Sequence, residues 1–210
     1  MRGRFISLEG GEGAGKTTLI ESLRSHLVAQ GREVVVTREP GGTPGAEDLR
    51  TILLTGSTDR WTPMTEALLM YAARVDHVER LIEPALQRGA WVLSDRFADS
   101  TIAYQGTGGG IALERIRKIQ DAALGGFAPD LTLILDLDPL VGLRRTVERG
   151  EDPTRFELFD TEFHTRLRQA FLDIAHEEPE RCALIDASKT PDQVFAAALD
   201  EMQSRLEVSA

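Results

Sequence analysis

Residues 5–17 decide the fold: they read FISLE, a short apolar run at 5–9, followed directly by GGEGAGKT at 10–17. The second part matches the template G-x-x-x-x-G-K-[ST], in which glycines let the chain turn so that several backbone N–H groups point inward. The apolar run predicts a strand, and an apolar stripe after the loop predicts a helix through Leu19, Ile20, Leu23, Leu27 and Val28. A strand, such a loop and a helix N-terminus together predict a site for the phosphates of a nucleoside triphosphate.

Two side chains of this phosphate loop have predicted tasks of their own. The Lys16 ammonium would neutralise the β- and γ-phosphates of ATP, and the Thr17 hydroxyl would reach Mg²⁺. We assign ATP binding to the loop and the first residues of its helix, namely Gly10, Gly11, Glu12, Gly13, Ala14, Gly15, Lys16, Thr17 and Thr18. Because a bound triphosphate does not define a reaction, the rest of the chain must identify it.

Four further short apolar runs alternate with helical patterns, at residues 34–36, 91–93, 131–137 and 183–185. This alternation predicts an α/β fold, a three-layer sandwich with a five-stranded parallel sheet, of the P-loop nucleoside triphosphate hydrolase type. Its ligands should lie outside the carboxyl ends of the strands. With 210 residues, of which 41% are hydrophobic, we expect a single domain at 1–210. A polar interruption of two helical patterns predicts a mobile lid at about 144–157.

The composition argues against several classes of protein. Asp and Glu number 34 against 24 Lys and Arg, so the net charge of −10 disfavours a nucleic-acid binder or a polybasic membrane binder. The lone cysteine, Cys182, excludes an internal disulfide and favours a reducing, cytoplasmic compartment. We expect no signal peptide, because no long apolar stretch follows Met1. The chain contains no asparagine, which argues against a GTPase with an Asn-Lys-x-Asp motif.

Three arginines predict a second anion site beside the phosphate loop. Arg38, Arg50 and Arg96 lie at or just beyond the carboxyl ends of neighbouring predicted strands, so they can converge on one crevice. A planar guanidinium there can pair with a phosphate through two hydrogen bonds. The alternative is that each arginine forms a surface salt bridge with a neighbouring carboxylate such as Glu47. A true second anion site would indicate a second phosphorylated ligand.

Three segments resemble those of bacterial-type thymidylate kinases, and the resemblance extends over almost the whole chain. They are TREPGGT at 37–43, MYAAR at 70–74, and DRF at 95–97 with the polar residues that follow it. The resemblance implies transfer of the γ-phosphate of ATP to thymidine monophosphate (dTMP), giving dTDP and ADP, with Mg²⁺ as cofactor. It also implies a homodimer, for which the apolar helix expected from Thr65 to Leu86 is a plausible interface element, although burial inside the monomer explains the same apolar stripe.

The resemblance also assigns an acceptor site. Arg50 and Arg96 would hold the acceptor phosphate, Arg74 would contact the base, and Tyr104 would pack beneath the sugar. Whether Met70 or the next residue covers the base stays open. The predicted substrate-binding residues are Glu39, Arg50, Met70, Tyr71, Arg74, Arg96, Thr101, Tyr104 and Gln105. The chain departs from many relatives at position 109, where they carry an arginine and it has Gly109.

For catalysis the resemblance implies that a lid supplies cations, since residues 10–16 include no arginine. We expect these to be Arg149 and Arg155 first, with Arg144 and Arg145 as alternatives that solvated helix charges explain about as well. The predicted catalytic residues are therefore Lys16, Arg149, Arg155, Arg96 and Glu12, and the predicted metal ligands are Thr17 and Asp95. No general base is needed, because the attacking phosphate oxygen is already ionised.

Two other functions remain open at this point. A deoxynucleoside kinase shares the loop and an arginine near the third strand, but phosphorylates a neutral hydroxyl and so needs a carboxylate base, for which Glu39 is a candidate. A P-loop regulatory ATPase would instead hydrolyse ATP without any nucleotide acceptor.

Overall fold

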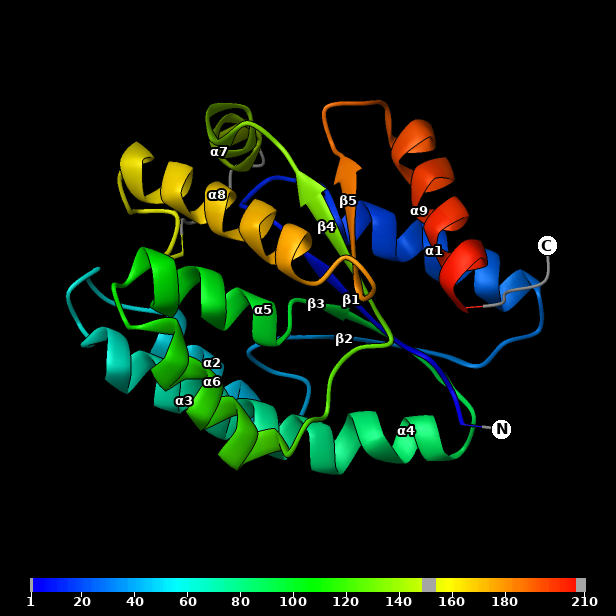
Figure 1. The fold of residues 1–210 in the computed structure, drawn as a ribbon, viewed down its shortest axis with the longest axis horizontal. Helices are drawn as coiled ribbons and strands as arrows, with labels where there is room; N and C mark the ends of the chain where they lie inside the picture. The colour runs from blue at the N-terminus through cyan, green and yellow to red at the C-terminus, as the bar shows by residue number, and fades with distance from the viewer. Residues whose placement is uncertain (1, 149–153, 207–210) are drawn as a thin grey trace.

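The computed structural model describes residues 2–148 and 154–206, and its centre is a parallel sheet (Figure 1). The strands are β1 (Phe5–Glu9), β2 (Val34–Arg38), β3 (Trp91–Asp95), β4 (Leu131–Asp136) and β5 (Cys182–Asp186). They lie in the order β2-β3-β1-β4-β5, with every neighbouring pair parallel. The predicted α/β fold with a five-stranded parallel sheet is therefore confirmed.

Strand β1 is buried along its whole length because it lies in the middle of the sheet. Its side chains alternate between the two faces: Ile6 and Leu8 join one apolar cluster, whereas Phe5 joins another on the opposite face. The register pairs Leu8 with Asp95, and Asp95 in turn with Arg38. Arg38, Asp95 and Glu9, the last residues of three neighbouring strands, therefore lie at the same edge of the sheet.

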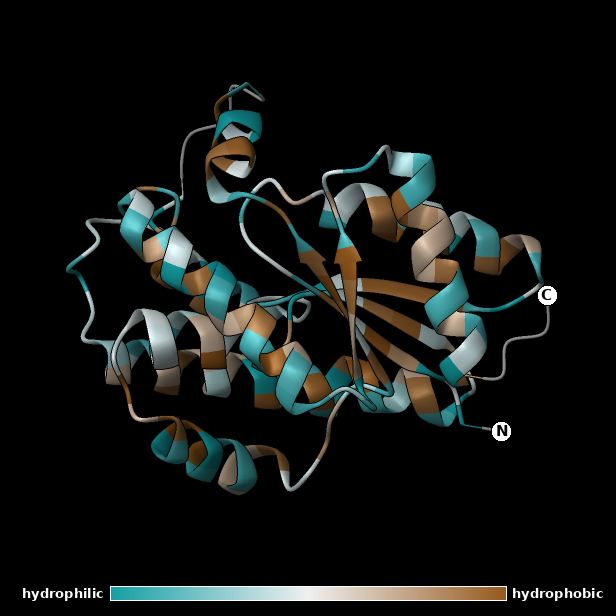
Figure 2. Cartoon of the chain, turned by 45° about the horizontal axis from the view of Figure 1, so that its top comes forward, coloured by the Kyte–Doolittle hydropathy of each residue, from teal (hydrophilic) through white to brown (hydrophobic). Residues whose placement is uncertain are grey.

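Helices cover both faces of the sheet. On one face α1 (Lys16–Ala29) and α9 (Pro191–Leu206) pack side by side over the strands. The opposite face carries α8 (Thr161–Glu177) and the segments between β2 and β4, and Figure 2 shows the strands as the hydrophobic centre of the molecule. The remaining elements are α2 (Pro44–Leu54), α3 (Pro63–His77), η1 (Val78–Ile82), α4 (Glu83–Gln87), α5 (Ala98–Thr101), η2 (Ile102–Gly108), α6 (Leu113–Leu124) and α7 (Pro139–Glu148), where η marks π-helical turns.

Side-chain caps fix where the site-bearing helices begin. Thr43 and Thr62 accept hydrogen bonds from the third residue that follows each, and a proline occupies the first helical position of both α2 and α3. Helix α1 begins differently, because its cap is Gly15, with φ at 94°. A left-handed glycine there leaves the first N–H groups of α1 facing outward from the loop.

The phosphate loop is packed directly on the first turn of α7. A Cβ atom added to Gly13 would overlap the carbonyl oxygen of Gly142, and one added to Gly142 would overlap the carbonyl oxygen of Glu12. The two backbones thus approach as closely as only glycine permits. None of the helices in the described part of the chain is both long and apolar enough to cross a lipid bilayer.

Candidate active site

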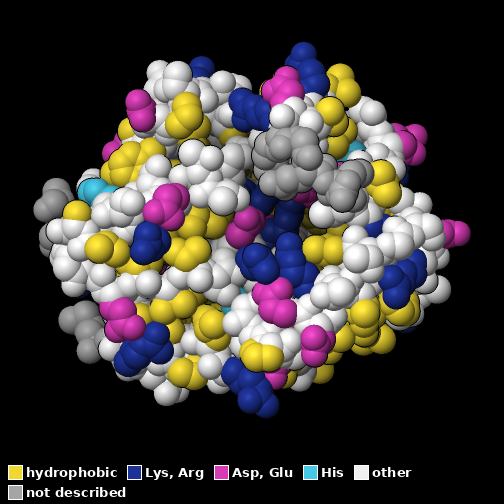
Figure 3. All heavy atoms as spheres, turned by 180° about the vertical axis from the view of Figure 1, so that it is seen from behind, with side chains coloured by type: hydrophobic (Ala, Val, Ile, Leu, Met, Phe, Trp, Pro, Cys, Tyr) yellow, Lys and Arg dark blue, Asp and Glu magenta, His cyan; other side chains and the backbone are white. Residues whose placement is uncertain are grey.

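A cavity of about 660 Å³ opens at the carboxyl ends of the strands. Its walls are the phosphate loop, the ends of β2 and β3, helix α3 and element η2. Figure 3 shows Lys and Arg side chains gathered in this hollow. Because the molecule is acidic as a whole, a local cluster of cations is the arrangement expected of an anion site.

Residues 12–18 of the phosphate loop and its helix line the cavity, whereas Gly10 and Gly11 are not among the lining residues. The carbonyl oxygens of those two glycines accept hydrogen bonds from the Lys16 ammonium at 3.1 and 3.0 Å. Burial, followed by the nearby Arg96, lowers the pKa of Lys16. The lysine is therefore held against the loop with little water around it, where its charge acts strongly on a neighbouring anion.

Arg96 joins the phosphate loop to the rest of the cavity. One guanidinium nitrogen donates to the carbonyl of Gly10 at 3.0 Å and to Ser100 at 3.2 Å, and the other donates to both carboxylate oxygens of Glu12, at 3.1 and 3.2 Å. Its backbone φ of 74° is left-handed, which for a non-glycine residue signals a conformation enforced by its surroundings. The strained turn aims the guanidinium into the cavity.

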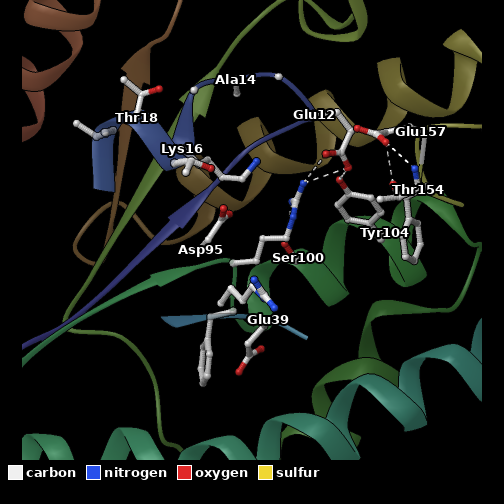
Figure 4. A pocket seen from close by; sticks show the side chains of 18 of the residues that line it. Glu12, Ala14, Lys16, Thr18, Glu39, Asp95, Ser100, Tyr104, Thr154 and Glu157 are labelled. Atoms are coloured by element: carbon white, nitrogen blue, oxygen red, sulfur yellow. Dashed lines mark hydrogen bonds and ion pairs between the residues drawn. The ribbon is translucent and has the colours of Figure 1, made fainter. Parts of the chain in front are cut away.

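Glu12 and Tyr104 point toward one another (Figure 4), and Arg96 contacts both. The Tyr104 hydroxyl donates to a Glu12 carboxylate oxygen at 2.6 Å, and the Arg96 guanidinium lies 5.0 Å from the centre of the tyrosine ring. Burial would raise the pKa of Glu12, but Arg96 and Lys16 outweigh it and lower that pKa to about 2. Burial raises the pKa of Tyr104. Glu12 is therefore a permanent anion that orients two neighbours.

Glu9 supports the same turn from below, and sequence reasoning missed it. The buried carboxylate accepts from the backbone N–H of Phe97 at 2.7 Å and from the Ser100 hydroxyl at 2.6 Å. Burial, together with the nearby Asp99, raises the pKa of Glu9 to about 7. A carboxylate that ends a fully buried strand was the signal available in the sequence.

Arg50 and Arg38 line the cavity wall across from the loop. Arg50 donates to the carbonyl of Pro40 at 2.8 Å, and Arg38 pairs with Glu47 at 3.0 Å. Burial lowers the pKa of Arg50, and the charge of Arg38 adds to this effect. Arg38, Arg50 and Arg96 line one cavity and make it an arginine-lined hollow, while Arg38 also forms the surface ion pair with Glu47 that the sequence left open as the alternative.

Arg74 lies at the far end of the cavity and is almost fully buried. It donates to Glu39 at 2.6 Å and, through a second nitrogen, to the carbonyl of Phe97 and the hydroxyl of Thr101, both at 3.1 Å. Its third nitrogen, Nη1, is buried and has no hydrogen-bond partner among the described residues. The other oxygen of Glu39 contacts the His77 ring at 3.0 Å. Glu39 is thus occupied in holding Arg74.

The two candidates for covering the base are separated in the structure. Met70 lines the cavity, whereas Tyr71 is buried outside its wall. The Tyr71 hydroxyl donates to Gln120 at 3.2 Å, and its ring lies under the Arg74 guanidinium at 4.8 Å. Of the two, Met70 is therefore the one that faces the cavity, whereas Tyr71 packs against Arg74.

The predicted lid arginines differ from expectation. Arg149 lies outside the described residues, and Arg155 is buried, with 1% of its surface exposed. The Arg155 guanidinium donates to the carbonyls of Leu53 at 3.0 Å and Thr58 at 3.2 Å, and forms an ion pair with Glu66. The sequence predicted Arg155 as a lid cation above ATP. The structure instead places its guanidinium in a buried ion pair with Glu66.

A different arginine reaches the phosphate loop from helix α7. Arg145 lines the cavity and donates to the carbonyl of Gly13 at 3.4 Å, although the sequence ranked it below Arg155. Arg145 can reach the phosphate loop because it lies one helical turn after Gly142, whose backbone is in close contact with that loop.

The predicted metal ligands lie on the same cavity wall. Thr17 is exposed toward it, and Oδ1 of Asp95 is buried without a hydrogen-bond partner among the described residues. Within residues 2–148 and 154–206, no three His, Cys, Asp or Glu side chains form a group that could hold a metal by themselves. These residues fit a Mg²⁺ ion that is held largely by substrate phosphates, with one carboxylate and a hydroxyl from the protein.

A backbone nest with a buried lysine, facing an arginine-lined hollow on the same cavity, defines the class of this protein as a P-loop nucleotide kinase. The comparisons with known proteins agree with that class. A protein-family model described as thymidylate kinase matches residues 8–198. The chain belongs to the thymidylate kinase family, and is thereby a nucleoside monophosphate kinase, a phosphotransferase.

Similar proteins cover the whole length of the chain. It is 56% identical to a thymidylate kinase of Caulobacter vibrioides, over 98% of each chain, and 49% identical to one of Magnetococcus marinus, over 100% of each. A crystal structure of thymidylate kinase from Ehrlichia chaffeensis matches with a TM-score of 0.77 at 33% identity, covering 97% of this chain and 100% of that one. The predicted family and enzyme class are confirmed.

Proposed function

We propose that this chain transfers the γ-phosphate of ATP to dTMP, giving ADP and dTDP. The observation that carries the proposal is the position of Arg96, which contacts the phosphate loop at Gly10 and shares one cavity with Arg50. A cation between two anion pockets favours an acceptor that is itself a phosphate. A deoxynucleoside kinase is disfavoured, because both oxygens of its candidate base, Glu39, already hold Arg74 and His77.

The catalytic task is to align two polyanions and to neutralise the charge that spreads over the transferred group. The loop N–H groups and Lys16 would bind the donor phosphates, while Arg50 and Arg96 would hold the acceptor phosphate. Glu12 keeps Arg96 in place through both carboxylate oxygens. From α7, Arg145 can approach the donor phosphates and takes the role for which Arg155 was expected.

The base and sugar would occupy the far end of the cavity. Met70 offers an apolar surface for the ring face, and Thr101 and Gln105 lie beside Arg74 at its edge. Tyr104 is fixed by its hydrogen bond to Glu12, so its ring forms a rigid floor below the sugar. An apolar cover with a few fixed polar groups is the usual construction of a site that recognises one small ligand.

Mg²⁺ would be held by Thr17 and Asp95 together with the phosphates. When bound, the ion supplies positive charge to the β- and γ-phosphates. The unpartnered Oδ1 of Asp95 supports this assignment, because a buried carboxylate oxygen without a partner is costly unless a ligand completes it.

We further propose one domain with a lid at about 144–157, acting as a homodimer in the cytoplasm. The surface exposure of Leu68 on α3, at 52%, supports an interface on that helix. Burial raises the pKa of the Cys182 thiol to about 12, which suits a structural cysteine of a reducing compartment. Size-exclusion chromatography with light scattering would test the dimer.

A coupled ADP-release assay tests the function. Purified protein with ATP and Mg²⁺ receives dTMP, dUMP, dCMP, dAMP, dGMP or thymidine in separate reactions. We expect turnover with dTMP well above the background hydrolysis of ATP. Activity with thymidine alone would instead identify a deoxynucleoside kinase, and hydrolysis that no acceptor changes would identify a regulatory ATPase.

A further inference from the structure

A chain of three buried side chains connects the end of the lid region to the far end of the cavity. Arg155 forms an ion pair with Glu66 through one carboxylate oxygen, and the other oxygen accepts from Nε2 of Gln105 at 2.6 Å. The exposed fractions of Arg155, Glu66 and Gln105 are 1%, 7% and 2%. Buried hydrogen bonds of charged groups are strong and costly to break, so this chain holds its geometry.

The direction of every hydrogen bond in this chain is fixed by chemistry. A guanidinium only donates and an ionised carboxylate only accepts, so Gln105 must turn its NH₂ group to Glu66. The Gln105 carbonyl oxygen is then left to accept from a ligand in the cavity that this residue lines. Arg155 itself cannot swing away easily, since the carbonyls of Leu53 and Thr58 also hold it.

Arg74 presents the opposite polarity on the same wall. Its unpartnered Nη1 is a donor, and its Nη2 is tied to Thr101, one helical turn before Gln105. Arg74, which is anchored to Thr101, and Gln105, one helical turn later, therefore give the same cavity a donor and an acceptor. The complementary ligand edge is a carbonyl beside an N–H, as in thymine and uracil, whereas cytosine offers an amino group beside a bare ring nitrogen and would meet both groups with the wrong polarity.

We propose that Glu66, held by Arg155, is a positioning residue that fixes the amide direction of Gln105 and so makes the site select pyrimidines with an N–H next to a carbonyl. This inference rests on the proposed function, because it takes a pyrimidine nucleoside monophosphate as acceptor. Neither Glu66 nor Arg155 lines the cavity. Their effect is transmitted through one amide group.

The variant Glu66→Gln tests the proposal, because it reverses the chain without changing its shape. Arg155 accepts nothing, so the new glutamine must give it the carbonyl oxygen and turn its own NH₂ toward Gln105. Gln105 must then flip and present NH₂ to the cavity. We expect the ratio of kcat/KM for dTMP over dCMP to fall on the order of 10- to 100-fold. The reason is that the Gln105 NH₂ group would then face the N–H of thymine, so that two donors replace a donor and an acceptor.

Three controls separate this effect from general damage. The dTMP to dUMP ratio should stay unchanged in Glu66→Gln, because both bases share the same edge. The double variant Glu66→Gln/Arg155→Met frees the new amide to accept from Gln105, so the dTMP preference should recover. The variant Asp99→Asn makes the same change in another buried ion pair, with Arg181 at 2.8 Å, and should leave the dTMP to dCMP ratio at its wild-type value.

The outcomes distinguish the proposed function from the positioning role of Glu66. A wild-type protein inactive on every pyrimidine nucleoside monophosphate would overturn the proposed function. A wild type active on dTMP, with Glu66→Gln keeping its full preference over dCMP, would overturn only the positioning role. If Glu66→Gln does not fold, NMR hydrogen exchange of the Gln105 side chain in the wild type decides: a protected amide proton supports the proposal, and fast exchange of both overturns it.

Discussion

Replacing Glu9 by glutamine should change how the stability of the protein depends on pH. The Glu9 carboxyl group is fully buried at the end of β1, and its pKa is raised from 4.5 to about 7, first by burial and then by Asp99. In the unfolded chain the same group ionises near its ordinary value. The folded protein therefore keeps this proton over a range of pH in which the unfolded chain has already lost it.

The sign and the size of the effect follow from that difference. A raised pKa gives stability that is complete below pH 4.5 and is lost as the pH rises through about 7. At 1.36 kcal/mol for each pKa unit, the loss amounts to about 3 kcal/mol. Glutamine has nearly the same shape and cannot titrate, so Glu9→Gln should escape the loss. The free energy of unfolding of the variant, minus that of wild type, should rise by about 3 kcal/mol between pH 4.5 and about pH 8.

Urea unfolding at a series of pH values measures this difference, with fluorescence or circular dichroism as the signal. The variant Glu114→Gln serves as a control, since that side chain is 78% exposed in a surface pair with Lys118 and should follow the wild-type curve. If the free energies of unfolding of Glu9→Gln and wild type differ by the same amount at every pH, the claim that Glu9 keeps its proton in the folded protein is refuted.

Three further substitutions test the site. Lys16→Ala should lower kcat by roughly 10²- to 10³-fold, because one preorganised charge at the donor phosphates is lost, while urea unfolding shows little change in stability. Asp95→Asn should raise the Mg²⁺ concentration for half-maximal rate by about tenfold or more in a metal titration, and an unchanged requirement would exclude it as a ligand. Tyr104→Phe removes the hydroxyl bound to Glu12 at 2.6 Å and should cost about 2 kcal/mol in the free energy of unfolding.

The sequence predicted the elements whose signals are local. The phosphate loop and the five strands follow from a motif and from short apolar runs, and convergence of Arg50 and Arg96 follows from the geometry of a parallel sheet. By contrast, the pairing of Arg155 with Glu66 joins residues 89 positions apart, and no local pattern announces it. Glu66 fixes the position of Arg155, and this contact is visible only in the folded structure.

The helix expected from Thr65 to Leu86 is present as one helical run from Pro63 to Gln87, but its pitch changes locally. It is divided into α3, the π-helical turn η1 from Val78 to Ile82, and α4. Pro84 supplies the physical reason, because its ring nitrogen has no hydrogen to donate to the preceding turn, so the helix must widen there. Apolar periodicity records which face is buried and says little about such a local change of pitch.

The contact between Gly13 and Gly142 has a mechanical consequence. Neither position accepts a side chain without forcing two backbones apart, so the nucleotide loop and the root of α7 behave as one rigid body. Any bending of α7 must therefore begin farther along the helix than Gly142. A donor nucleotide that shifts the phosphate loop would therefore shift the first turn of α7 with it.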